Sequence, residues 1–112
     1  MVDEEHKKAR VQRVLAFFTK NREELGLSPI QVSVLMATYV YPGLLEQNVA
    51  PMLGCGKTTV YDACISLMGP KAPPAAKQNL ITPIQYLDRV RTDVGILLRL
   101  TPPGQGLVEM LV

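Results

Sequence analysis

The sequence contains few residues of the kinds that build disulfide frameworks, metal sites and histidine-dependent catalytic centres. It has 2 cysteines and 1 histidine. Two cysteines do not make the disulfide framework of a small secreted protein, and together with His6 they fall short of the four ligands of a structural zinc site. His6 also lacks the partners of a catalytic triad. We therefore expect no metal, no cofactor and no enzymatic activity, and a reducing, cytoplasmic location.

Long apolar runs and a strong net charge are also missing. No apolar stretch approaches the length that crosses a bilayer, and the acidic start over residues 1–5 does not resemble a signal peptide. The formal net charge is only +2, which by itself does not indicate a nucleic-acid partner. A chain of 112 residues can bury one core without disulfides or metal. We expect one soluble domain over residues 1–112, without a membrane partner.

The charges that are present are unevenly distributed along the chain. Between Leu27 and Gly56 the single charged residue is Glu46, so this segment is typical of a protein core. From Lys57 onward there are six basic and four acidic residues. The second half of the chain is therefore the part in which a charged binding surface is expected.

Hydrophobic spacing predicts a helix over residues 3–25, because Val11, Val14, Leu15 and Phe18 recur at three- and four-residue steps. Its broad apolar stripe must pack on the domain or on a second copy of the chain, which makes it the expected seat of a homodimer. We expect the remaining core unit to occupy residues 28–104.

Two helices are predicted next. Ser28 as N-cap and Pro29 at the first helical position begin one helix, and Pro42-Gly43 closes it. Its predicted inner face contains Val32, Leu35, Met36, Tyr39 and Val40. A short helix follows within Leu45–Leu53, limited to about two turns by Pro51, with Asn48 as a candidate cap.

The stretch from Cys55 to Met68 predicts an amphipathic helix behind a glycine turn, with Thr58 or Thr59 as its N-cap. The residues of its predicted buried face are Val60, Ala63, Cys64, Leu67 and Met68. The residues of its predicted outer face are Lys57, Thr58, Thr59, Tyr61, Asp62 and Ser66. Short hydrogen-bonding groups with one aromatic ring and one cation can read base edges, while the lysine and the helix N-terminus meet phosphate. The alternative is an ordinary amphipathic helix whose outer face meets solvent.

The chain after Gly69 predicts a proline-rich loop carrying Lys71 and Lys77, and then a β-hairpin. The predicted strands are Leu80–Leu87 and Ile96–Thr101, joined through a bend at Thr92, Asp93 and Gly95. Arg89 and Arg91 are expected near the tip. A basic hairpin after a helix-turn-helix is typical of the wing of a winged helix, which can put an arginine into a narrow minor groove. The alternative is a solvated hairpin. A short terminal helix is predicted over residues 105–112.

Two further motifs have competing interpretations. Gly56-Lys57-Thr58 resembles the end of a phosphate-binding loop, but Pro51 stands where that loop begins with glycine and no buried strand precedes it. Cys55, beside Lys57 and a helix start, is either a redox-sensitive thiol or a small residue tolerated in a turn, and we favour the turn.

The chain resembles the winged-helix domain of the multiple-antibiotic-resistance regulator (MarR) family. The residues that carry the resemblance lie, in the family's order, at 27–35, 42–43, 49–54, 58–61 and 98–104. The resemblance implies a dimeric DNA-binding repressor, with base contacts from the helix near Thr58 and an arginine of the hairpin in the minor groove. The family's aspartate-arginine signature matches either Asp88-Arg89 or the region of Asp93. The chain ends about a dozen residues after its last predicted strand, so a small-molecule effector is not expected.

Together these features predict an α+β winged helix-turn-helix of about four helices and a hairpin wing, which binds double-stranded DNA and regulates transcription. The predicted DNA-binding residues are Lys57, Thr58, Thr59, Tyr61, Asp62, Ser66, Lys71, Lys77, Arg89 and Arg91. The competing class is a winged-helix protein interaction module without DNA binding, which the small net charge and Asp62 keep open.

Overall fold

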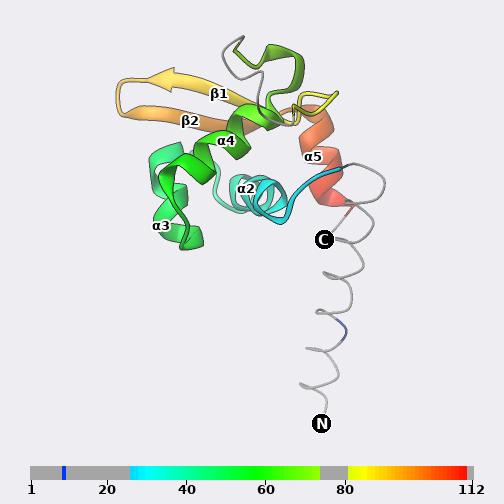
Figure 1. Cartoon of the computed structure of the whole chain (residues 1–112), viewed down its shortest axis with the longest axis horizontal. Coiled ribbons are helices and arrows are strands. Elements are labelled where there is room, and N and C mark those ends of the chain that lie inside the picture. Colours follow the sequence, from blue (N-terminus) through cyan, green and yellow to red (C-terminus); the bar gives the residue numbers. More distant parts are fainter. Residues whose placement is uncertain (1–8, 10–25, 74–80, 111–112) are drawn as a thin grey trace.

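Helices surround a small core, and a β-hairpin lies beside them in the computed structural model (Figure 1). The structure describes residues 9, 26–73 and 81–110. The elements in these ranges are α2 (Pro29–Val40), η2 (Glu46–Asn48), α3 (Val49–Leu53), α4 (Lys57–Leu67), η3 (Gly69–Lys71), β1 (Leu87–Thr92), β2 (Gly95–Leu100) and α5 (Pro102–Glu109), of which η2 and η3 are 3-10 helices. The predicted α+β winged-helix class is thus confirmed. The predicted helix 3–25 and its dimer contact lie outside the described residues, apart from Ala9.

Helix α2 begins where its capping residues predict. Ser28 Oγ accepts a hydrogen bond from the backbone N–H of Gln31 at 3.3 Å, and Gln31 Oε1 accepts one from the backbone N–H of Ser28 at 2.7 Å. This reciprocal capping box satisfies backbone donors at the helix start. Val32 and Leu35 are buried as predicted, but Val40 is 60% exposed. Its assignment to the inner face was wrong, because Ala37 and Thr38 are the buried residues of this last turn.

The turn between α3 and α4 depends on two glycines. Gly54 ends α3 in the left-handed conformation, with φ of 68°, which glycine adopts without steric cost. Gly56 is the N-cap of α4, and no side chain caps this helix start. The prediction that Thr58 or Thr59 caps α4 was therefore wrong, since the helix already begins at Lys57.

The hairpin is antiparallel, with Arg91 opposite Ile96 and Thr92 opposite Gly95. The predicted bend is confirmed, but the predicted first strand was wrong, because β1 covers residues 87–92 instead of 80–87. Part of the predicted segment, residues 81–86, runs along the end of α4. There the backbone N–H of Thr82 donates to the Ser66 carbonyl at 3.0 Å.

The inner edge of the hairpin is joined to the segment before η2. Leu45 forms an isolated antiparallel bridge with Leu97, and the backbone N–H of Leu98 donates to the Leu44 carbonyl at 3.0 Å. This isolated bridge attaches the hairpin to the chain that leads into the helix-turn-helix. The hairpin therefore has a fixed position relative to α3 and α4.

The core lies between α2, α4, the hairpin and α5. Its fully buried side chains are Val32, Val34, Leu35, Val49, Val60, Cys64, Ile65, Leu67, Leu87, Leu98 and Val108. Helix α5 begins at Pro102, three residues before the predicted start, because the side chain of Thr101 accepts a hydrogen bond from the Gly104 backbone N–H and acts as N-cap. Gly104 packs so closely on the Tyr86 carbonyl that a Cβ at this position would overlap it. Helix α5 is thereby placed against the start of β1.

Candidate nucleic-acid interface

The outward face of α4 is polar and accessible. Lys57, Thr58, Thr59, Tyr61 and Asp62 are all exposed, and the Tyr61 residue is 46% exposed. Val60, Ala63, Cys64 and Leu67 turn inward and are buried, as the helical spacing predicts. Because no side chain caps the helix start, the first-turn N–H groups are open to an external acceptor.

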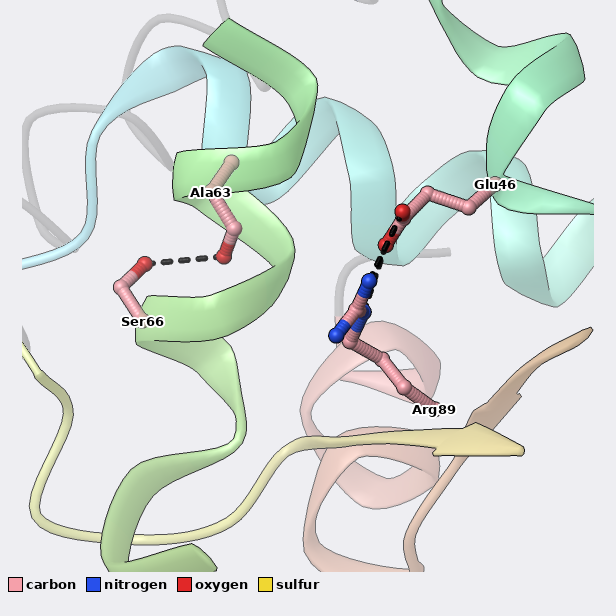
Figure 2. Close-up of polar contacts among 4 residues, drawn as sticks. All are labelled: Glu46, Ala63, Ser66 and Arg89. Atoms are coloured by element: carbon pink, nitrogen blue, oxygen red, sulfur yellow. Dashed lines mark hydrogen bonds and ion pairs between the residues drawn. The ribbon is translucent and has the colours of Figure 1, made fainter. Parts of the chain in front are cut away.

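Ser66 does not belong to this face. It is only 3% exposed, and its hydroxyl accepts a hydrogen bond from Gln31 Nε2 at 2.6 Å. The same hydroxyl donates a hydrogen bond to the Ala63 carbonyl at 2.8 Å (Figure 2). The Thr82 hydroxyl donates to the Ser66 carbonyl at 3.0 Å. The placement of Ser66 on the outer face of α4 was therefore wrong, because Gln31 and the segment around Thr82 contact it.

Arg89 lies in the middle of β1, opposite Leu98, and its side chain turns toward the helices. Its Nε donates to Glu46 Oε1 at 2.6 Å, and its Nη2 donates to Glu46 Oε2 at 2.9 Å (Figure 2). The guanidinium carbon lies 5.2 Å from the centre of the Tyr61 ring. Hydrogen bonding to Glu46 raises the pKa of Arg89 above its ordinary value. The expected position near the hairpin tip was wrong for Arg89.

Arg91 occupies the tip position instead. It is exposed and stands one residue pair from the end of the hairpin, where Thr92 faces Gly95. Successive strand residues alternate between sheet faces, so Arg91 lies on the same face as Arg89, toward α4. Arg99 lies on the opposite face, paired with Asp88 at 3.6 Å. Arg91 is therefore an exposed cation on the sheet face turned toward α4.

A groove joins the beginning of α4 to the hairpin. It has a volume of about 350 Å³. Its walls include Lys57 and Tyr61 from α4, Gln47 from η2, and Gly95 and Ile96 from β2. The first half of α4 and the turn of the hairpin thus open onto one shared surface.

Lys71, the connector lysine that the structure describes, does not line this groove. Lys71 is exposed on η3, which directly follows α4, so it stands at the opposite end of that helix from Lys57. An α-helix of 11 residues is about 16 Å long. Lys77 lies outside the described residues.

The chemistry of the cysteines is limited. Both are free, with Cys55 partly buried in the glycine turn and Cys64 buried. Burial, and then the nearby Glu46 carboxylate, raise the pKa of the Cys64 thiol well above its ordinary value, which keeps it neutral and unreactive. In residues 26–73 and 81–110, His, Cys, Asp and Glu side chains form no group of three that could hold a metal ion. None of the helices described has the length and hydropathy of a membrane span.

Comparison with known proteins gives one informative similarity. No family model and no curated protein matches this chain. Among solved structures, transcriptional regulator Tm0710 from Thermotoga maritima matches with a TM-score of 0.66 and 18% sequence identity. The match covers 98% of this chain and 69% of that one. The two chains share the winged-helix fold. At this identity the similarity establishes the fold, and it does not test the resemblance to the MarR family.

Two residues of the site region were missed by sequence reasoning, Glu46 and Gln31. Glu46 is the single charge of the segment 27–56, and an isolated charge in an otherwise uncharged core segment is a signal for a buried ion-pair partner. Gln31 stands three residues after Ser28, which is the spacing of a capping box. Neither signal identifies the partner, since Arg89 and Ser66 lie far away in the sequence.

Proposed function

We propose that this chain is a sequence-specific, MarR-like DNA-binding transcriptional regulator, with α4 in the major groove and the β1–β2 wing on the adjacent backbone or minor groove. The observation that carries the proposal is the shared surface on which the polar face of α4 and the turn of the hairpin meet. The solved protein of the same fold is a transcriptional regulator, which supports the same function.

The residues of α4 would contact either phosphates or base edges, according to their chemistry. Lys57 and the open N–H groups of the first turn suit phosphate, because they offer positive charge and unpaired donors. Thr58, Thr59 and Tyr61 offer hydroxyl groups to base edges in the major groove. The Asp62 carboxylate can accept a hydrogen bond from the amino group of cytosine.

In the wing, Arg91 alone would contact DNA, whereas the sequence suggested both Arg89 and Arg91. Arg91 is exposed on the sheet face turned toward α4, whereas the charge of Arg89 is neutralised by Glu46. Lys71 and Lys77 remain candidates for contacts with flanking phosphates. A homodimer through residues 3–25 would place two copies of α4 in half-sites about one helical turn apart.

A salt titration of DNA binding tests the function. The full chain is titrated with a fluorescent duplex of random sequence at several salt concentrations. We expect affinity to fall steeply with salt, and Arg91→Ala to reduce the logarithmic slope by about 0.9, the value of one phosphate contact. Arg99→Ala is the matched control, because Arg99 lies on the other sheet face, and it should leave the slope unchanged. Absence of salt-dependent binding would reject the proposal in favour of a protein interaction module.

A further inference from the structure

Three elements of the proposed interface meet at one cluster, formed by Glu46, Tyr61 and Arg89. Glu46 belongs to η2, Tyr61 to the outward side of α4, and Arg89 to the wing strand β1. Figure 2 shows the Glu46 and Arg89 side chains directed toward each other from their separate elements. The guanidinium also lies over the Tyr61 ring, 5.2 Å from its centre. Arg89 therefore connects the wing to the helix that would read the bases.

The position of Arg89 is fixed by its contact with Glu46. Both carboxylate oxygens accept a hydrogen bond, at 2.6 and 2.9 Å, and this two-point contact fixes the plane of the guanidinium as well as its place. The side chains of Arg89 and Glu46 are only 16% and 15% exposed. A guanidinium that is neutralised and covered in this way is unsuited to bind a phosphate.

Tyr61, in contrast, is an exposed aromatic side chain on a helix. Without a contact its ring would sample several rotamers, and ordering it on DNA would cost binding free energy. The Arg89 cation over one face of the ring favours a single orientation, by the attraction between a cation and an aromatic quadrupole. This contact would reduce the number of ring orientations in the free protein.

We propose that Glu46 and Arg89 are positioning residues that set the orientation of Tyr61, and that Tyr61 determines which DNA sequence is preferred. This inference rests on the proposed function. It assigns Arg89 an effect on sequence preference and none on the number of phosphate contacts. Arg89 acts through Tyr61, and Glu46 acts through Arg89.

The first experiment needs no DNA. Ring signals of the four tyrosines are recorded by NMR on the full chain, and Tyr61 is assigned by its loss in Tyr61→Phe. The test variant combines Glu46→Gln with Arg89→Met, which leaves no unpaired charge behind and so keeps the fold. We expect the Tyr61 signals to move toward those of a free tyrosine in this variant and in Arg89→Lys, and to stay in place in Arg99→Lys. Unchanged Tyr61 signals in both the combined variant and Arg89→Lys would overturn the positioning role.

The second experiment measures binding to two probes, a duplex of random sequence and the duplex that the wild-type chain selects from a random pool. We expect the combined variant to bind the selected duplex about tenfold more weakly, as for the loss of one base contact, while its salt slope and its affinity for random DNA stay the same. In a Tyr61→Ala background the combined change should have no further effect, because residues that act through one contact are not additive.

The outcomes separate the two proposals. A salt slope reduced by about 0.9 in the combined variant would show that Arg89 touches phosphate, and would overturn its positioning role while supporting DNA binding. Additive losses for the Tyr61 and Arg89 changes would likewise refute action through Tyr61. If the wild-type chain binds neither duplex, the proposed function fails, and the NMR result still decides whether Arg89 orients the ring.

Discussion

Replacing Glu46 with Gln should destabilise the fold by about 2–3 kcal/mol, which lies between the values typical of exposed and fully buried ion pairs. At the observed separations of 2.6 and 2.9 Å, the attraction between the two charges is about 6 kcal/mol at an effective dielectric constant of about 20. Dehydration of both ions offsets most of this gain. Removing one charge loses the attraction but leaves the other ion covered, because the Arg89 side chain is only 16% exposed.

Urea unfolding followed by circular dichroism measures this loss. The matched control is Asp88→Asn, which breaks the other ion pair of the hairpin. That pair is longer, at 3.6 Å, and its side chains are 61% and 37% exposed, so its loss should cost less than about 1 kcal/mol. Adding Arg89→Met to Glu46→Gln should recover at least half of the loss, since no unpaired charge remains. If Glu46→Gln and Asp88→Asn both lower the unfolding free energy by the same small amount, the larger cost assigned to breaking the Arg89–Glu46 pair is refuted.

Three further predictions concern packing, a buried hydrogen bond and pH. Gly104→Ala should cost more than about 2 kcal/mol of unfolding free energy, because its Cβ would overlap the Tyr86 carbonyl and α5 would have to shift; thermal melting checks this. Ser66→Ala should cost about 1–2 kcal/mol by leaving the Gln31 amide donor unpaired, and should leave DNA affinity unchanged. The pKa of Cys64 is raised in the folded protein, so the thiol's contribution to stability is complete below its unfolded pKa of about 8.5 and is lost as pH rises above it. The unfolding free energy should therefore fall as pH rises in this range. Cys64→Ala should remove this pH-dependent fall, as measured by urea titrations.

Local signals were sufficient for the start of one helix and for the buried face of another. Ser28-Pro29 specified the start of α2, and the spacing of Val60, Ala63 and Leu67 identified the buried face of α4. These features depend on capping and helical periodicity, which act over a few residues. The division of the chain into a helix at residues 3–25 and a core unit at 28–104 stays a prediction.

Features that depend on distant contacts were not predictable in the same way. Ser66 stands at the border of the polar face in a helical projection, and its burial results from the segment around Thr82 that packs over it. Residues 88–91 look like a charged loop, yet they form β1, where Arg89 is compensated by Glu46. In both cases the partner is contributed by another part of the chain, so the pattern of one segment could not reveal it.

The isolated bridge between the hairpin and the segment before η2 also has a consequence for how the chain folds. The hairpin closes through a two-residue turn, but the bridge between Leu45 and Leu97 joins segments that are far apart in sequence, so it forms only after a costly loop closure. Until then the edge of β2 exposes unpaired backbone groups beside Ile96, Leu97 and Leu98, an apolar strand that can pair with another chain. Aggregation during refolding should therefore start at this strand, and its rate should depend on how quickly the segment before η2 covers it.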